Sequence, residues 1–234
     1  MIPLLKILKR ILIITKKGII GLMLLSIFAT LIMRWVNPPF GSMLMIERKI
    51  MHWNTPQQRI WKDLDEISDN IKIAVIASED QHFPTHWGFD FKAIRLALDH
   101  NQNSKKIKGA STITQQVAKN IFLWPSRSWI RKGIESWFTL WIELFWSKQR
   151  ILELYLNCAE WGEGIFGIEA ASQHYFNVSA SQLTSQQASL LAAVLPNPRR
   201  WSPITPSERV QKRAKWIHAQ MRNLGNNNYL KKLK

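Results

Sequence analysis

The sequence predicts a mainly α-helical domain behind one N-terminal transmembrane helix. An uncharged run, Gly18 to Met33, lies close to the N-terminus. After Ile71, apolar residues recur at helical spacing and several segments open with capping residues. No segment shows the alternation of apolar and polar residues that is typical of a half-buried strand. With 234 residues, the chain has room for an anchor and one domain of roughly 180–200 residues.

The apolar run has the features of an uncleaved signal anchor. Residues 1–17 are basic and contain no acid, and residues 18–36 form the predicted span, which is near the short limit for crossing a bilayer. By the positive-inside rule, the lysines before it keep the N-terminus cytoplasmic and the rest is exported. A cleaved signal peptide shares the basic start and apolar middle, but bulky residues, Met33-Arg34-Trp35, follow the run in place of small ones.

The remainder divides by composition. Asn37-Pro38-Pro39 breaks the helix and opens a connecting segment, residues 37–70. Residues 71–225 form the predicted domain, and residues 226–234 form a basic C-terminal tail. Helices are expected at residues 71–79, 90–99, 111–122, 129–146, 148–158, 168–176, 185–195 and 205–224, the last one capped at Thr205 and stopped by Gly225.

Charge is high and segregated. The formal net charge is +16, and no acid occurs in residues 1–34 or 100–134, whereas acids outnumber bases between Gly133 and Pro198. Such segregation predicts anionic partners at particular faces, and nucleic acid, anionic lipid headgroups and a pyrophosphate all qualify. The single cysteine, Cys158, excludes an intramolecular disulfide framework.

Glu79 is the candidate general base. It closes an apolar helix, where one carboxylate facing a polar cleft can take or give a proton. Taken alone, such an acid is more often structural than catalytic. His82 and His86 follow it, but no third ligand is near them in the sequence, so a zinc site is not expected. The other motif residues around this acid are Asp80, Phe83, His86 and Gly88.

A polar cluster, Gly109 to Gln116, opens the next predicted helix. Ser111 and Thr112 stand beside free helix N–H groups, a ready anion site. Gln115 and Gln116 carry donors and acceptors that suit sugars or phosphates. Helix capping alone would explain the serine and threonine, but it does not explain the two glutamines.

Arg127, Arg131 and Glu135 share a helix face because they are spaced by four. One reading is a solvated ladder of ion pairs worth about 0.3–0.5 kcal/mol each. The other is a diphosphate clamp that includes Lys119, since arginine forks grip phosphate oxygens in a bidentate manner. In the next helix, Lys148 to Cys158, Tyr155 and its apolar neighbours are expected to pack, while Glu153 and Asn157 tie adjacent helices together.

These segments, in order, resemble the motifs of the peptidoglycan glycosyltransferases, glycosyltransferase family 51. The matching patterns are Glu-Asp-x-x-Phe-x-x-His-x-Gly at Glu79, Gly-x-Ser-Thr-Ile-Thr-Gln-Gln at Gly109, Arg-Lys-x-x-Glu at Arg131, Lys-x-x-Ile-Leu-Glu-x-Tyr-Leu-Asn at Lys148, and the segment Leu195-Pro196-Asn197-Pro198. The resemblance covers roughly residues 71–203.

The resemblance implies a lysozyme-like fold and polymerisation of lipid II in the cytoplasmic (inner) membrane of a bacterium. Glu79 would deprotonate the GlcNAc 4-hydroxyl of lipid II, which attacks the undecaprenyl-pyrophosphate-linked chain with inversion. Glu135 is implied as the second catalytic acid. Substrate and pyrophosphate contacts are implied for Ser111, Thr112, Gln115, Gln116, Lys119, Arg127 and Arg131, with support from Asp80, Phe83, His86, Gly88 and Lys132.

The resemblance also bears on cofactors and partners. It leaves open a divalent cation, Mg²⁺ or Mn²⁺, at Glu135, and implies no organic cofactor. Cell-wall synthases or divisome proteins are candidate partners besides the membrane, and nucleic acid is not expected. Two alternatives remain: a lytic muramidase of the same fold, for which Glu79 is a general acid, and a membrane-tethered basic adaptor without enzymatic activity.

Tryptophan gathers in one short region, Trp124 to Trp146. Because tryptophan favours the membrane interface, Trp124 and Trp129 are expected to touch lipid. Trp137 and Trp141 fall at helical spacing and can instead face the core. A chain that begins near Phe40 is then expected to remain active and still bind liposomes.

Overall fold

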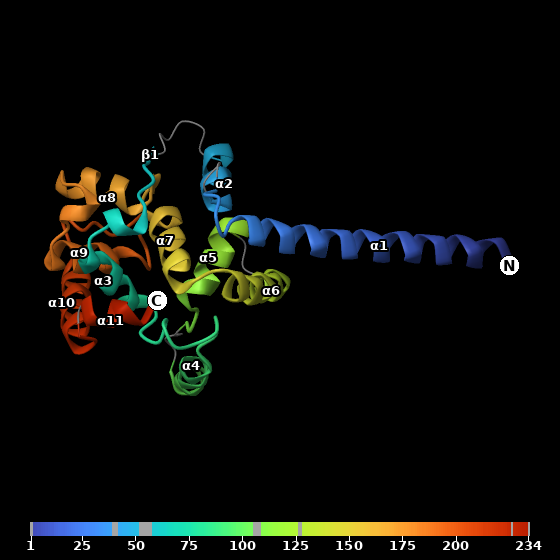
Figure 1. The fold of residues 1–234 in the computed structure, drawn as a ribbon. Helices are drawn as coiled ribbons and strands as arrows, with labels where there is room; N and C mark the ends of the chain where they lie inside the picture. The colour runs from blue at the N-terminus through green and yellow to red at the C-terminus, as the bar shows by residue number, and fades with distance from the viewer. Residues whose placement is uncertain are drawn as a thin grey trace.

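The fold is known from a computed structural model, which describes residues 2–38, 42–51, 58–104, 109–125, 128–225 and 227–233. Figure 1 shows a mostly helical body from which one long helix projects. This helix, α1 (Ile2–Ile32), contains a stretch from Leu8 to Ile32 that is long and apolar enough to cross a membrane. The helix includes the basic residues expected to precede the span and ends four residues earlier than the expected boundary at residue 36.

The end of α1 nearest the body packs against α6 (Trp129–Phe145). The indole N–H of Trp137 donates to Ser26 Oγ over 3.0 Å. Arg150, on α7 (Lys148–Cys158), donates to the carbonyl oxygen of Met33 over 3.0 Å and to that of Val36 over 3.1 Å. These bonds tie α1 directly to the domain that follows it in the chain.

Two groups of helices make up the body (Figure 1). In the first, α3 (Asp69–Glu79) packs with α9 (Ser185–Val194) and α10 (Glu208–Asn223). In the second, α5 (Ile113–Phe122) packs with α6 and α7, and α8 (Ile168–Phe176) contacts α7. Helix α4 (Phe91–Asn103) lies at the margin of the body, and only Ala97 of its residues is buried.

One continuous core joins the groups. α3 is buried from Ile71 to Ala77. Its apolar residues lie on all sides of the helix, so neighbouring elements can cover it on several sides. Trp161, Phe83 and Tyr155 are among the largest fully or nearly fully buried side chains. Asn157 is fully buried, accepts from the N–H of Lys62 and donates to its carbonyl, so it ties α7 to the segment before η1 and not to a neighbouring helix as expected.

Several small elements escaped the sequence analysis. α2 (Met43–Met51) lies in the connecting segment. A three-stranded sheet has the order β1–β3–β2, built from β1 (Gln58–Arg59), β2 (Glu160–Gly162) and β3 (Ile165–Phe166). β1 and β3 are parallel, and β2 and β3 are antiparallel. Strands of two or three residues are too short for an alternating pattern. The 3-10 helix η1 (Leu64–Glu66) was also missed, whereas η2 (Ala180–Gln182) begins with the capping box of Ser179 and Gln182 that the sequence predicts.

Two boundaries at the C-terminal end differ from expectation. α10 begins after Ser207, two residues later than the predicted cap Thr205. The segment predicted as a basic tail forms α11 (Asn227–Leu230) and η3 (Lys231–Leu233), and α11 packs on α3. Tyr229 and Leu233 are buried there, while Lys231 and Lys232 between them stay exposed.

Candidate active site

Glu79 lies at the C-terminal end of α3, where the two helix groups meet. Its Oε2 accepts a hydrogen bond from Gln116 Nε2 of α5 over 3.0 Å. Its Oε1 accepts one from Arg213 Nη2 of α10 over 3.1 Å. The carboxylate is therefore held from both groups, yet its side chain stays 16% exposed and can be reached from solvent.

Asp80 is buried and organises the loop after α3. Its carboxylate accepts from His86 Nε2 at 2.9 Å and from the backbone N–H of Ile113, the first residue of α5, also at 2.9 Å. His86 Nδ1 accepts from the N–H of Gly88, so the ring proton lies on Nε2 and points at Asp80. The anion site expected at the start of α5 is thus filled by the protein's own carboxylate.

Gly88 fits a position that no other residue would fill without strain. Its φ is +77°, and a Cβ there would lie 2.6 Å from Thr139 Cγ2 and 2.9 Å from Glu143 Cγ, both of α6. Its carbonyl oxygen accepts from Thr112 Oγ1 over 2.7 Å. The loop from α3 is therefore locked against both α5 and α6.

Thr112 and Gln115 are buried and serve as scaffold. Thr112 Oγ1 accepts from the N–H of Gln115, and Gln115 Oε1 accepts from the N–H of Thr112, which is a capping box. Together with the bond from Thr112 Oγ1 to Gly88, these bonds hold the start of α5 in place beside the site. Phe83 is likewise fully buried, with the ammonium of Lys148 4.8 Å from its ring centroid.

A basic cluster surrounds the buried Glu135 on α6. Arg131 Nη1 donates to Glu135 Oε2 over 2.7 Å, and Lys132 Nζ is paired with Glu135 Oε1. Lys132 Nζ also donates to Ser111 Oγ over 3.3 Å, so the exposed hydroxyl of Ser111 joins the cluster. Arg127 lies outside the described residues. Two cations on one buried carboxylate leave net positive charge for an anionic ligand.

Lys119 connects this cluster to Glu79. It is half-buried on α5, and burial lowers the pKa of its ammonium group, while Arg131 and Lys132 lower it further. The negative charges of Glu135 and Glu79 both raise the pKa of Lys119, so the ammonium group interacts with both acids. Lys119 lies three positions after Gln116 on α5, so it follows the side chain that bonds Glu79 by about one turn of the helix.

Sequence reasoning missed three contributors. Arg213 lies in the basic helix α10, where nothing in the local pattern separates it from its basic neighbours. Glu143 accepts from Thr114 Oγ1 over 2.5 Å and from Lys148 Nζ over 2.8 Å, which joins α5, α6 and α7. The hydroxyl of Tyr155 donates to Gln116 Oε1 over 3.3 Å. These residues come from distant helices, and their roles depend on the folded packing.

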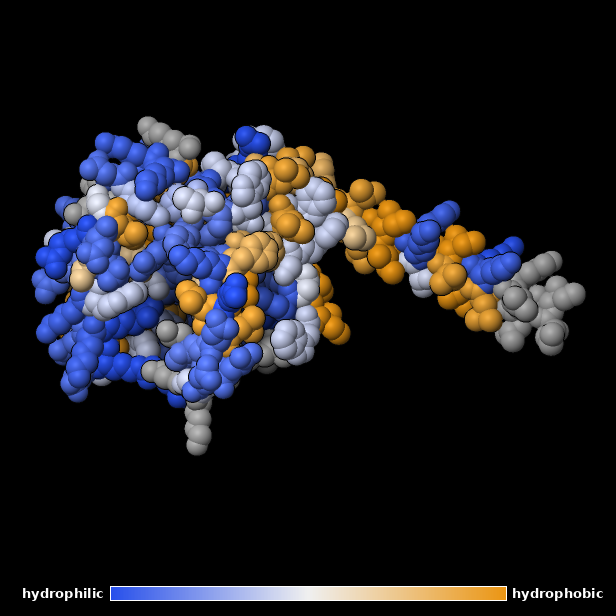
Figure 2. Space-filling view, turned by 90° about the horizontal axis from the view of Figure 1, so that it is seen from below, coloured by the Kyte–Doolittle hydropathy of each residue, from blue (hydrophilic) through white to orange (hydrophobic). Residues whose placement is uncertain are grey.

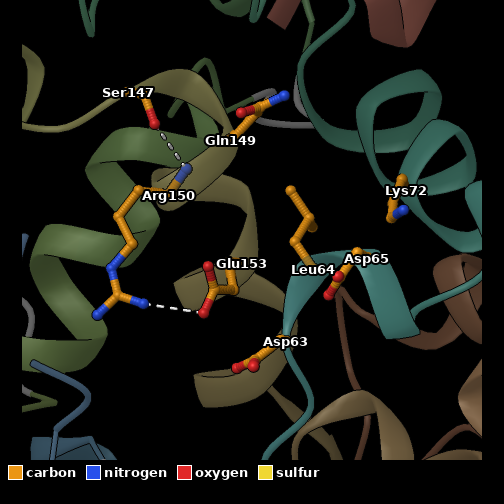
Figure 3. A pocket seen from close by; sticks show the side chains of 8 residues that line it. All are labelled: Asp63, Leu64, Asp65, Lys72, Ser147, Gln149, Arg150 and Glu153. Atoms are coloured by element: carbon orange, nitrogen blue, oxygen red, sulfur yellow. Dashed lines mark hydrogen bonds and ion pairs between the residues drawn. The ribbon is translucent and has the colours of Figure 1, made fainter. Parts of the chain in front are cut away.

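A cavity of roughly 470 Å³ lies elsewhere, between η1 and the start of α7 (Figure 3). Three carboxylates face it, from Asp63, Asp65 and Glu153. Arg150 Nη1 donates to Glu153 over 2.8 Å, and burial raises the pKa of Glu153. None of the predicted site residues lines this cavity, and its carboxylates would repel an anionic substrate.

The side chains around Glu135 do not suit a protein-held divalent cation. Both carboxylate oxygens are already engaged by Arg131 and Lys132. Within the part of the chain that the structure describes, no three His, Cys, Asp or Glu side chains are grouped so that they could hold a metal ion. A cation at this place would also meet the charges of the surrounding lysine and arginine side chains.

Comparison with known proteins identifies the family. The transglycosylase family matches residues 47–222. Three relatives are each named biosynthetic peptidoglycan transglycosylase. The protein from Pseudomonas fluorescens is 58% identical over 221 residues, which cover 93% of this chain and 92% of the relative. The protein from Stutzerimonas stutzeri is 56% identical over 222 residues, which cover 93% of this chain and 91% of the relative. That from Pseudomonas syringae is 58% identical over 212 residues, covering 89% of each. The chain therefore belongs to the transglycosylase family.

Proposed function

We propose that this transglycosylase polymerises lipid II into linear glycan strands of peptidoglycan for the bacterial cell wall. The observation that carries the proposal is that α5 joins two groups: Gln116 on α5 bonds Glu79, and Ser111 at the start of α5 bonds Lys132 of the basic cluster at Glu135. This arrangement offers a base for a sugar hydroxyl on one side and counter-charge for a pyrophosphate on the other. Both are needed when the donor sugar is linked to a pyrophosphate.

In the proposed reaction, Glu79 removes the proton from the 4-hydroxyl of the acceptor GlcNAc. The hydroxyl oxygen then forms the new glycosidic bond at the anomeric carbon of the donor chain, on the face opposite the leaving group, which inverts the configuration. The bond from that carbon to the undecaprenyl pyrophosphate breaks, and the pyrophosphate keeps the electron pair. The proton remains on Glu79 until it passes to solvent.

The leaving pyrophosphate gains negative charge, and we assign its stabilisation to Lys119, Arg131 and Lys132, with Ser111 as a hydroxyl donor. The role of Glu135 is to hold Arg131 and Lys132 in place from a buried position. Arg127 is proposed as a further phosphate ligand on its spacing alone. A divalent cation, if one takes part, would be bound by the pyrophosphate oxygens, because the side chains around Glu135 are already paired.

We place the domain on the outer face of the cytoplasmic membrane, with the N-terminus inside. The basic residues at the start of α1 support this orientation. Apolar side chains on the body next to the anchor support contact with the bilayer (Figure 2). On and beside α6, Trp129 is 92% exposed and Trp124 45% exposed. Such contact would let the polyprenyl tail stay in the bilayer, which it leaves only at about 0.8 kcal/mol per CH₂.

Incubation of the purified full-length protein with labelled lipid II in detergent or vesicles tests the proposal. We expect polymer to form, and Glu79→Gln to abolish it, because the loss of a general base costs about 10²–10⁴ in rate. Glu163→Gln, at an exposed glutamate outside the site, is the matched control and should keep wild-type activity. Cleavage of preformed glycan without polymer formation would establish a muramidase instead, and binding without turnover would establish an adaptor.

A further inference from the structure

The hydroxyl of Tyr155 reaches the candidate base through one intermediate side chain. Tyr155, on α7, is 2% exposed, and its hydroxyl donates to Gln116 Oε1 over 3.3 Å. Gln116 Nε2 donates to Glu79 Oε2 over 3.0 Å. Burial raises the pKa of the Tyr155 hydroxyl well above its ordinary value, and the charge of Glu79 raises it further. The hydroxyl therefore keeps its proton across the working pH range.

The amide orientation of Gln116 is fixed by its two neighbours. An ionised carboxylate only accepts hydrogen bonds, so the amide must present its NH₂ group to Glu79. Its oxygen then faces Tyr155, where the hydroxyl supplies the proton. The reversed amide would set an oxygen against the Glu79 carboxylate, which is repulsive. The observed order of donors thus matches the ionised, base-competent form of Glu79.

The same three groups can reverse their order when Glu79 has taken a proton. A protonated carboxyl can donate, a turned amide can accept that bond through its oxygen, and the amide NH₂ can then donate to the hydroxyl oxygen of Tyr155. A hydroxyl serves in both orders because it is a donor and an acceptor. A phenylalanine at this position would serve in neither.

We propose that Tyr155 is a positioning residue that, through Gln116, holds Glu79 in its base-competent form and supports it after proton transfer. This inference rests on the proposed role of Glu79 as the base. Tyr155 touches neither the substrate nor the reacting atoms, and its side chain acts only through Gln116. The proposal is supported by a continuous chain of hydrogen bonds from the buried hydroxyl of Tyr155, through Gln116, to the partly exposed carboxylate of Glu79.

Other groups face Glu79 and must be separated from this effect. Arg213 of α10 holds the second oxygen, Oε1. Lys119 of α5 interacts with Glu79 through its charge. Asp80 follows Glu79 in the chain, but its carboxylate is directed to His86 and to the N–H of Ile113. Among these contacts, the chain through Gln116 is the one that carries no charge, so its effect should be insensitive to salt.

The test is a double-mutant cycle on the full-length protein with labelled lipid II. Tyr155→Phe keeps the ring and removes the hydroxyl. We expect kcat to fall about three- to tenfold, the range that one neutral hydrogen bond supports, with KM almost unchanged. In a Gln116→Ala background, the same change should alter kcat by less than about twofold, because the connection to Glu79 is already broken. Tyr175→Phe, on α8, is the matched control and should behave as wild type.

The pH profile supplies a second readout that a packing role would not move. Without the hydroxyl, the amide is no longer held with its NH₂ group towards Glu79, so the acid limb of the rate profile should move to higher pH. Incorporation of 3-fluorotyrosine at position 155 makes the hydroxyl a stronger donor, so the limb should move to lower pH. If the melting curve shows that Tyr155→Phe does not fold, the pH profile of the 3-fluorotyrosine protein still tests the positioning role of Tyr155.

Two results would overturn the inference: unchanged kcat and pH profile in Tyr155→Phe, or an undiminished loss in the Gln116→Ala background. Both are distinct from failure of the proposed function. If Glu79→Gln polymerises lipid II at the wild-type rate, the base assignment itself is wrong. If Glu79→Gln is inactive while Tyr155→Phe matches wild type, only the positioning role fails.

Discussion

Trp146 donates its indole N–H to the carbonyl oxygen of Thr30 over 2.7 Å, and both residues are buried. Thr30 lies in the last turn of α1, where carbonyl groups lack partners within the helix. Arg150 donates hydrogen bonds to the carbonyl oxygens of Met33 and Val36, just after the helix. The anchor helix is therefore capped by side chains of the domain it carries, and its final turns belong to the fold of that domain.

A chain that begins at Phe40 should be less stable than the full chain. It loses these bonds and uncovers Trp137 and other aromatic side chains of α6 that α1 contacts. A loss of at least about 2 kcal/mol is expected, which lowers Tm by roughly 5 °C. A chain that begins at Gly18 retains the contacts and is the control for melting curves in detergent; equal Tm values for the two would refute the coupling.

Gly88→Ala should destabilise the loop that carries the first motif. The substitution forces an alanine to a φ of +77° and drives its Cβ to within 2.6 Å of Thr139. Together these effects should cost about 2–4 kcal/mol. Gly133→Ala is the opposite case, since it lies exposed in α6 with nothing within 4 Å of its added Cβ, and it should stabilise by about 0.5–1 kcal/mol. Chemical denaturation gives the free energy of unfolding of each variant relative to wild type, and the two changes should have opposite signs.

Lys119 should set the alkaline limit of activity. Burial lowers the pKa of its ammonium, so the charge needed to stabilise pyrophosphate is lost at lower pH than for an ordinary lysine. Activity should fall as pH rises through this lowered pKa. Lys119→Arg should move the fall to higher pH, because a guanidinium stays charged. Profiles of kcat/KM from neutral to alkaline pH check this, with Lys215→Arg, an exposed lysine, as control. If the alkaline fall in kcat/KM occurs at the same pH in wild type, Lys119→Arg and Lys215→Arg, Lys119 is not the group that titrates.

Arg131→Ala should reduce turnover strongly, and Arg131→Lys should restore only part of it. Alanine removes a proposed phosphate ligand and leaves the buried Glu135 with one fewer partner. Lysine restores the charge but not the planar fork that grips two oxygens. Steady-state kinetics should show a loss on the order of 10²-fold for alanine, a typical value for one electrostatic donor. Arg200→Ala, at an exposed arginine, should be neutral. Wild-type turnover in Arg131→Ala would mean that Arg131 serves only to pair with Glu135.

The long helices and the acid motif could be predicted because their signals are local. The apolar run before Glu79, the helix cap expected at Ser111 or Thr112 and the i,i+4 pair of Arg131 and Glu135 can each be recognised within one or two helical turns. The bond from Arg213 to Glu79 spans 134 positions in the chain, and that from Tyr155 to Gln116 spans 39. Such bonds depend on how helices pack, which no local pattern encodes.

The start of α5 shows how a correct local prediction can lead to a wrong chemical one. Free N–H groups at a helix N-terminus do attract anions, as expected from Ser111 and Thr112. In the folded chain the anion is the carboxylate of Asp80, brought there by the loop after α3. The physical rule holds, but the ligand is internal, because a buried carboxylate needs donors as much as the helix needs an acceptor.

Trp129 should report contact between the domain and the bilayer. It is 92% exposed at the start of α6, the helix that α1 packs against, so it lies on the body next to the anchor. In vesicles with brominated acyl chains, which quench nearby indoles, Trp129→Phe should lower the quenched share of the fluorescence from the 12 tryptophans. Trp216→Phe, on α10 and 47% exposed, is the matched control and should leave that share unchanged, since α10 belongs to the other helix group. Equal quenching in wild type and Trp129→Phe would mean that α1 alone meets the lipid, and that the tryptophan-rich end of α6 faces water.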